Sequence, residues 1–275
     1  MPRSGALRKI TPALEPVKRD AALPPGQGTR YMGAMCGRVV QASPPDILSL
    51  QIVEGRGDPA GDRFRNTPPR FNGAPAQELW VIRQNLSTGE RSLDLLRWGL
   101  IPAGSPEKPK KPFVNAAAEL LTKRDEFGPA YARRRCIVPI DGFYEWKPVE
   151  GEKIKQPFCI AMRDGSPFGL AGLWENWKDP GTGEWIRTFC IVTTRANALV
   201  RPIHYRMPAI LKPADFRRWL GPEEDPGDLL GPFPAEEMIA WPVSTRVNSV
   251  RNDDRSLVER HPEADGTWPS DGNSA

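Results

Sequence analysis

One cysteine in this sequence stands where it could do chemistry that no other residue can. Residues 35–38 read Met-Cys-Gly-Arg and begin a stretch with a strand-like pattern. If the working chain starts at Met35 and loses that methionine, Cys36 carries a free α-amine beside its thiol. The amine would condense with an aldehyde to an imine, and the thiol would then close a five-membered thiazolidine. An internal Cys36, whose nitrogen is an amide, could not do this, and its alternative role is that of a buried thiol.

The α-amine is the more reactive partner at neutral pH. Its pKa lies near 7.7–8.0, against about 10.4 for lysine, so roughly a tenth of such amines are neutral at pH 7. Ring closure by the neighbouring thiol is intramolecular, and effective molarities of order 10⁵ M are typical of well-oriented cases. The thiazolidine is therefore much harder to reverse than a simple imine.

Glu145 is the first candidate for moving protons. It lies between Tyr144 and Trp146 in a strand-like segment, and alternation would place it on the same face as Phe143. A carboxyl group packed among apolar rings has a raised pKa and can exchange a proton near neutral pH. The alternative is a water-exposed glutamate on an edge strand.

His204 is the second candidate, because the only other histidine, His261, lies near the C-terminus. It belongs to the segment Ile-His-Tyr-Arg-Met-Pro that ends at Pro208. A loop position and the nearby Arg206 favour a functional role. A purely structural histidine remains the alternative.

Several polar and basic residues could bind a substrate or could be structural. Asn115 could cap a helix, and Asn72 could be only a turn residue. The basic clusters are either solvated faces or, with Trp98, the lining of a channel for a phosphate backbone and unstacked bases. The clusters are Lys108, Lys110 and Lys111, and Arg133, Arg134 and Arg135. The channel would also include Arg38, Arg97 and Arg206.

Bulk composition favours a folded, cytoplasmic protein. Hydrophobic residues make up 39% of the 275, with 9 Trp, and neither a membrane-spanning run nor a signal-peptide core is seen. The net charge of +4 comes from residues 1–34, which hold six basic and two acidic residues; 32 of each sign remain from Met35 onward. Overall charge therefore does not argue for nucleic acid.

Cysteine usage argues against a metal site. None of the four cysteines forms a CxxC pair, and only two histidines are present, so we expect no metal or other cofactor. Disulfides are not expected in a chain of this type. Cys136, Cys159 and Cys190 are predicted to be buried thiols.

The pattern along the chain predicts an α+β fold in a single domain. We expect a curved, barrel-like, mostly antiparallel sheet with short peripheral helices. Residues 1–34 form a disordered extension or precede the true start, residues 35–252 form the domain, and residues 253–275 form a flexible tail. The predicted strands are 38–41, 79–82, 91–100, 136–140, 143–146, 156–162, 169–177, 185–194, 209–211 and 238–243, and the predicted helices are 47–53, 115–121, 196–200 and 213–220.

These motifs together resemble one family, the SOS-response-associated peptidases (SRAP), which are abasic-site processing proteins. The resemblance runs from Cys36 to about Asn252. It is carried by Met-Cys-Gly-Arg (35–38), Arg-Phe-Asn (70–72) with Ala-Pro (74–75), Arg-Trp-Gly-Leu-Ile-Pro (97–102), Asn-Ala (115–116) with Glu119, Arg-Cys-Ile-Val-Pro (135–139), Asp-Gly-Phe-Tyr-Glu-Trp (141–146), Ile-His with Arg-Met-Pro (203–208), and Trp-Pro-Val-Ser (241–244).

The resemblance implies a DNA-repair function. Family members bind single-stranded DNA, and an N-terminal cysteine crosslinks to the aldehyde of an abasic site as a thiazolidine. By position Cys36 would be the nucleophile, Glu145 the general acid and base, His204 an assistant, and Asn115 an orienting residue. The same reading assigns DNA contacts to Arg38, Asn72, Trp98 and Arg206. The expected partner is single-stranded DNA containing abasic sites, with no membrane, and the protein would act as a monomer near the nucleoid.

Two features depart from the family pattern. A basic residue usually stands two positions after the Asn of Asn-Ala, where this chain has Ala117. Losing one phosphate contact should weaken DNA binding and its salt dependence. The residues before Cys36 would also mask its amine, so the active chain should begin at Cys36.

Two other functions stay open at this point. Cys36 could serve an N-terminal-nucleophile amidohydrolase or self-processing peptidase, consistent with the family's peptidase label. That reaction needs an oxyanion hole, which the sequence does not reveal. A non-catalytic nucleic-acid-binding module would bind with salt dependence and form no covalent product.

Overall fold

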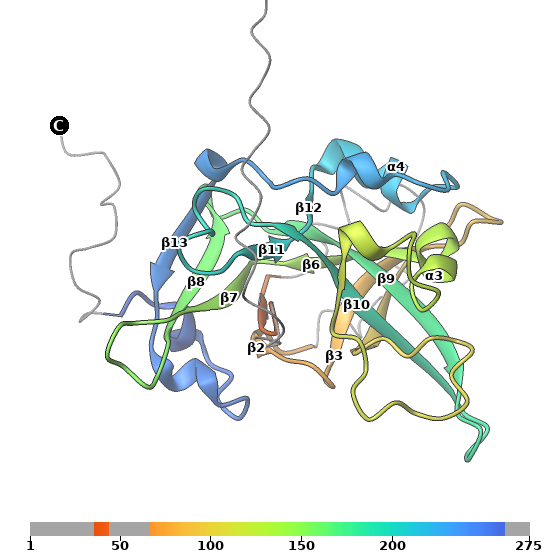
Figure 1. Cartoon of the computed structure of the whole chain (residues 1–275), viewed down its shortest axis with the longest axis horizontal. Coiled ribbons are helices and arrows are strands. Elements are labelled where there is room, and N and C mark those ends of the chain that lie inside the picture. The colour runs from red at the N-terminus through yellow and green to blue at the C-terminus, as the bar shows by residue number, and fades with distance from the viewer. Residues whose placement is uncertain (1–35, 44–66, 262–275) are drawn as a thin grey trace, which may run out of the picture. The chain divides into compact units, whose positions relative to one another are not determined.

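A closed barrel of five strands forms the centre of the fold. The computed structural model describes residues 36–43 and 67–261 (Figure 1). The barrel strands are β3 (Glu78–Gln84), β4 (Arg91–Trp98), β6 (Arg135–Ile140), β9 (Phe168–Lys178) and β10 (Trp185–Arg195). Hydrogen-bonded pairs run β4–β3–β6–β9–β10, and β10 returns to β4. Among these five barrel pairs only β4–β10 is parallel. The predicted barrel-like, mostly antiparallel sheet is therefore confirmed.

A second, wholly antiparallel sheet packs beside the barrel. Its order is β13–β8–β7–β1–β2. The strands are β1 (Val39–Gln41), β2 (Arg70–Gly73), β7 (Gly142–Lys147), β8 (Gln156–Met162) and β13 (Met238–Pro242). The Gln41 side chain joins the two sheets, because it donates to the carbonyls of Trp80 and Pro139 and accepts from the Trp80 N–H.

The helices are short and peripheral, as predicted. Among the described residues, the α-helices are α3 (Gly128–Arg133) and α4 (Phe216–Leu220). The 3₁₀ helices are η1 (Ala118–Leu120), η2 (Pro213–Asp215), η3 (Gly227–Leu229), η4 (Ala235–Glu237), η5 (Thr245–Asn248) and η6 (Arg255–Val258). None of the helices in the described parts of the chain is long and apolar enough to cross a membrane.

Strict alternation along the strands sorts the apolar residues into layers. Phe189 and Ile191 of β10 belong to one cluster with Leu79 and Val81, whereas Cys190 and Val192 belong to another with the helix residues Tyr131, Phe216 and Trp219. The first cluster joins barrel residues to residues of the second sheet, such as Ile160, and the second cluster includes the helix residues. In β7, Phe143 joins the first cluster and Tyr144 a third one, so the predicted alternation across Glu145 is confirmed.

The helix predicted over 115–121 is wrong. Residues Asn115–Ala117 form strand β5, which pairs in parallel with β10, and only Ala118–Leu120 turns as a 3₁₀ helix. Asn115 is therefore a strand residue and not a helix cap. The alanines favour a helix by propensity, but pairing with the edge of β10 outweighs that small preference.

Two further predictions need correction, and one lies outside the described residues. Residues 196–200 form a turn instead of a helix, in which the buried Asn197 side chain accepts from the Val200 N–H. Residues 253–261, assigned to a flexible tail, include η6, whose Leu257 is fully buried. The helix predicted over 47–53 falls in the part of the chain that is not described.

The end of β10 gathers several short strands. β9 pairs with one edge of β10 as far as Ile191, and β4 pairs with the other edge at Thr188 and Phe189. Beyond these points β5 continues along the β4 edge, and β11 (Arg206–Pro208) pairs with the last residues of β10 on the β9 edge. Short β12 (Ile210–Leu211) then pairs with β9.

Candidate active site

The backbone nitrogen of Cys36 contacts the carboxyl group of Glu145. The Cys36 N–H donates to Glu145 Oε1 at 2.6 Å, although the two residues lie 109 positions apart in the sequence. Cys36 lies three residues before the start of β1, and β1 pairs with β7, which carries Glu145. The sheet therefore brings together the two residues for which the sequence predicted the main chemistry.

Burial controls the protonation of Glu145. The residue is 2% exposed, and burial raises the pKa of its carboxyl group to about 8, although hydrogen bonds from the backbones of Cys36 and Trp146 oppose this rise. Glu145 faces Phe158 across the β7–β8 pair. The alternative of a water-exposed edge glutamate is thereby excluded, and the group is able to give or take a proton near neutral pH.

The Cys36 side chain is also withdrawn from water. It is 1% exposed and packs in the core cluster that spans the barrel and the second sheet. Burial, and after it the charge of Glu145, raises the thiol pKa well above its ordinary value. At neutral pH the side chain is therefore a thiol, and its reaction as a nucleophile requires a base.

Cys36 has a backbone conformation that is unusual for a non-glycine residue. Its φ is 39°, a value in the left-handed region. This torsion involves the carbonyl carbon of the preceding residue. A chain beginning at Cys36 has no such torsion, so any cost of this conformation applies only when Cys36 is internal.

His204 lies in the turn between β10 and β11. His204 Nδ1 lies 3.1 Å from the Arg206 backbone nitrogen and 3.2 Å from the Arg206 carbonyl oxygen, so the backbone of Arg206 holds the ring through this one atom. Burial lowers the pKa of His204 below its ordinary value, so the ring is neutral at pH 7. The Tyr205 ring stacks on it, with centroids 4.6 Å apart.

Lys155 is a residue that the sequence did not single out. It is exposed in the loop between β7 and β8, and its positive charge lowers the pKa of both Glu145 and His204. Both groups therefore lie within electrostatic reach of the same ammonium group. No motif marked Lys155, because the loop around it reads as an ordinary charged turn.

Arg38 and Asn72 form a polar cluster with the loop after η5. Asn72 is buried, accepts from Arg38 Nη1 at 2.9 Å, and donates to the carbonyls of Val247, Ser249 and Asn252. Arg38 also donates to the Val247 and Asn248 carbonyls. Asn72 thus fixes the loop, and the half-buried Arg38 is the member with exposed surface.

Two residues predicted to contact DNA are engaged elsewhere. Arg206 binds both oxygens of Glu119, at 2.7 and 2.9 Å, and also donates to the Thr193 carbonyl. Trp98 is 1% exposed, donates its indole N–H to the Val114 carbonyl and stacks on Phe189. Neither Trp98 face is open to a base, so we do not retain Trp98 as a stacking platform.

Most of the arginine cluster at 133–135 is structural as well. Arg135 is buried and donates to the carbonyls of Trp219 and Gly221, which attaches α4 to β6. Arg134 pairs with the buried Glu175 at 2.9 Å. Of the three arginines, only Arg133 is exposed.

Asn115 is held on the strand beside β10. It lies in register with Ile191, and the preceding residue, Val114, packs on the core cluster that contains Cys36. Asn115 therefore lies near the end of β10, where β11 also pairs and where the His204 turn follows.

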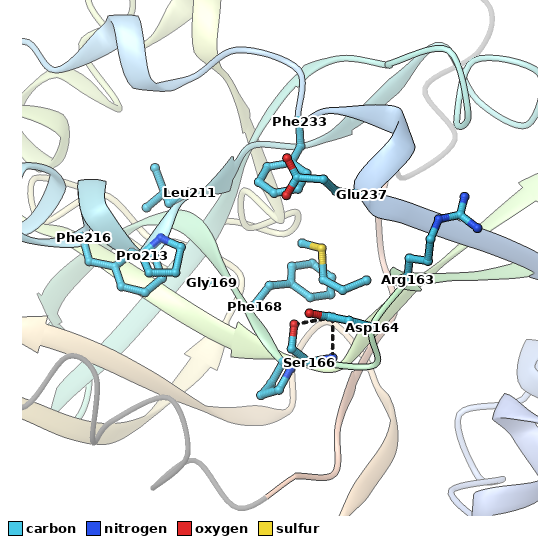
Figure 2. A pocket seen from close by; sticks show the side chains of 12 residues that line it. Arg163, Asp164, Ser166, Phe168, Gly169, Leu211, Pro213, Phe216, Phe233 and Glu237 are labelled. Carbon is cyan, nitrogen blue, oxygen red and sulfur yellow. Dashed lines mark hydrogen bonds between the residues drawn. The ribbon is translucent and has the colours of Figure 1, made fainter.

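A cavity of about 370 Å³ lies elsewhere, at the end of β8 away from the Glu145–Phe158 pair (Figure 2). Phe168, Phe216 and Phe233 line it, and none of Cys36, Asn115, Glu145 and His204 does. Its Ser166 hydroxyl donates to Asp164 at 2.6 Å. This largely apolar cavity is therefore separate from the candidate chemistry.

Metal chemistry finds no support among the residues that the structure describes. No group of three or more His, Cys, Asp or Glu side chains is placed there to hold a metal ion. The chemistry available at the site is that of a nitrogen, a thiol and a carboxyl group of raised pKa.

The site thus places a cysteine nitrogen and its thiol beside a buried glutamate carboxyl group, next to a closed barrel. Residues 35–250 match the family described as SOS response associated peptidase (SRAP), and the chain belongs to this family. It is 37% identical over 232 residues to the abasic site processing protein YoqW of Bacillus subtilis, covering 82% of this chain and all of the relative.

A second relative carries the same kind of name, and a solved structure has a similar fold. The chain is 32% identical to the abasic site processing protein YedK of Escherichia coli, covering 82% of this chain and 99% of the relative. A crystal structure of a Bacteroides thetaiotaomicron protein superposes with a TM-score of 0.71 at 26% identity, covering 82% of this chain and 100% of that one.

Proposed function

We propose that this protein processes abasic sites in single-stranded DNA by forming a covalent thiazolidine through Cys36. The observation that carries the proposal is the contact between the Cys36 nitrogen and the Glu145 carboxyl group at 2.6 Å. In a chain that begins at Cys36 this nitrogen is the α-amine, which is the nucleophile the reaction needs. Relatives such as YoqW and YedK are named abasic site processing proteins.

The reaction starts when the neutral amine attacks the aldehyde carbon of the open-chain sugar. A C–N bond forms, and the carbonyl oxygen becomes the hydroxyl of a carbinolamine. Protonated Glu145 donates a proton to that hydroxyl, water leaves and an iminium ion remains. The thiol sulfur then adds to the iminium carbon, and its proton passes to the Glu145 carboxylate. The amine, the thiol and the aldehyde have combined with loss of one water.

A carboxyl group with a raised pKa suits both proton transfers. Burial raises the Glu145 pKa to about 8, so the group is an acid in the first step and, once deprotonated, a base in the second. General acid–base catalysis of this kind typically contributes 10²–10⁴-fold to a rate. The base is needed because burial keeps Cys36 as a thiol. In the processed chain, a positive α-ammonium would lower the Glu145 pKa, and the two groups would share a proton.

His204 and Asn115 have secondary roles. The His204 ring is neutral at pH 7 and is suited to exchanging a proton with a sugar oxygen. Asn115, on β5, orients the sugar or the amine. Lys155 adds positive charge beside Glu145 and His204, where a DNA phosphate would be attracted.

The test is a gel assay with protein starting at Cys36 and single-stranded DNA containing one abasic site. We expect an adduct that survives denaturation. Cys36→Ser keeps the amine and loses the thiol, so it should give only an imine that hydrolyses. Glu145→Gln should form the adduct 10²–10⁴-fold more slowly. Cys159→Ala removes another buried thiol and is the control.

The competing functions predict other outcomes. A Cys36→Ala protein that forms the same adduct in equal yield would refute the proposal. Hydrolysis of peptides, or removal of residues 1–35 by the purified protein, would favour a self-processing peptidase that uses the same Cys36. Salt-dependent binding without any covalent product, whatever the N-terminus, would favour a non-catalytic binding module.

A further inference from the structure

An exposed arginine stands at the end of β10, close to the candidate site. Arg195 is the last residue of β10 and lies opposite Arg206 of β11. It is exposed, and within residues 36–43 and 67–261 no hydrogen bond or ion pair holds its guanidinium group. Its charge reaches Glu119, which is already bound to Arg206. An arginine in this condition is available to an anion.

Arg195 lies on the same face of the sheet as Ala117, where the family pattern would have a basic residue. Ala117 of β5 lies in parallel register with Thr193 of β10, so the two side chains leave the same face of the sheet. Arg195 follows Thr193 by two residues and shares that face. A guanidinium group from the neighbouring strand therefore extends over the side of the sheet on which the family's usual basic residue would stand.

A large exposed aromatic ring precedes Arg206, the residue that pairs with this arginine. Tyr205 is 63% exposed, and its ring lies on His204. It precedes Arg206, the partner of Arg195, and its carbonyl accepts from the N–H of Ala196. This hydrogen bond ties the backbone of Tyr205 to Ala196, the residue that follows Arg195. An exposed aromatic ring and an exposed arginine at neighbouring backbone positions supply the two elements that bind single-stranded nucleic acid.

We propose that Arg195 and Tyr205 hold the nucleotide next to the abasic site, Arg195 through its phosphate and Tyr205 by stacking on its base. This inference rests on the proposed binding of single-stranded DNA, but not on the covalent step. It assigns the two types of contact to different residues, so each has its own signature. A phosphate contact depends on salt, whereas stacking on a base does not.

The test measures affinity of the full chain for an undamaged single-stranded oligonucleotide by fluorescence anisotropy at several salt concentrations. Arg195→Ala should lower the slope of log K against log salt by about 0.7, which corresponds to about fivefold weaker binding at 0.1 M salt. Tyr205→Ala should weaken binding by about 5- to 150-fold and leave the slope unchanged. Adding Ala117→Arg to Arg195→Ala should restore the slope.

The other end of β10 supplies matched controls. Arg187→Ala and Trp185→Ala alter an exposed arginine and a 62% exposed aromatic ring on the same strand, and both should bind like the unaltered protein. An Arg195→Ala slope equal to that of the unaltered protein, or equal losses for Tyr205→Ala and Trp185→Ala, would overturn the inference. Failure to form a covalent adduct, with these binding effects intact, would overturn only the proposed chemistry.

Discussion

Replacing Glu145 by glutamine in the full chain should change how stability depends on pH. The carboxyl pKa is about 8 in the folded protein, against an ordinary value of 4.5. A carboxyl group with a raised pKa binds its proton more tightly when folded, so its contribution is complete below pH 4.5 and is lost as pH rises toward 8. The loss is about 1.4 kcal/mol per pH unit within this window. Glutamine does not titrate and can still accept from the Cys36 N–H.

Urea denaturation at pH 5, 6 and 7 measures the effect. The free energy of unfolding of the unaltered protein minus that of Glu145→Gln should fall by about 2–3 kcal/mol from pH 5 to pH 7. The subtraction removes His204, which both proteins contain and whose lowered pKa acts in the opposite direction. Phe143→Leu, on the same face of β7, should change stability equally at all three pH values. A constant difference for Glu145→Gln, or one that grows with pH, would refute the assignment of a protonated carboxyl group.

Three further predictions concern the frame of the site. Asn72→Ala removes a buried amide that binds Arg38 and three loop carbonyls, and it should lower the free energy of unfolding by about 2–4 kcal/mol in urea; a loss below 0.5 kcal/mol would show that the loop holds itself. Leu257→Ala should cost about 2–5 kcal/mol, whereas a flexible segment would tolerate it without loss. All four thiols are buried, so a thiol reagent should label the folded full chain far more slowly than the urea-unfolded chain, and rapid labelling of Cys36 would contradict its burial.

Most barrel strands were predictable because their side chains alternate and their turns carry clear signals. Glu145 followed the same logic, since alternation placed it with Phe143, and the structure confirms that face. The strand at Asn115 was not predictable, because its three residues favour a helix locally and become a strand only by pairing with β10. The prediction that Trp98 contacts DNA was wrong for a similar reason, because the sequence does not distinguish a core tryptophan from an exposed stacking platform.

Other features of the site depend on distant neighbours. Nothing near Cys36 in the sequence indicates that its nitrogen meets a carboxyl group 109 residues away. The neutral state of the Cys36 thiol follows from burial, which the strand pattern did not reveal. Arg206 and Arg135 look alike in sequence as basic residues, and only their contacts with Glu119 and with helix-end carbonyls show that both are engaged within the protein.

The most direct test of the proposed function is the intact mass of the covalent product. Protein beginning at Cys36 and the full chain are each incubated with single-stranded DNA that carries one abasic site, and the products are weighed after denaturation. We predict an adduct whose mass is that of the Cys36-initiated protein plus the DNA less one water. The full chain, whose Cys36 nitrogen is an amide, should give none. An adduct that retains residues 1–35, or one formed in equal yield by Cys36→Ala, would contradict the proposal.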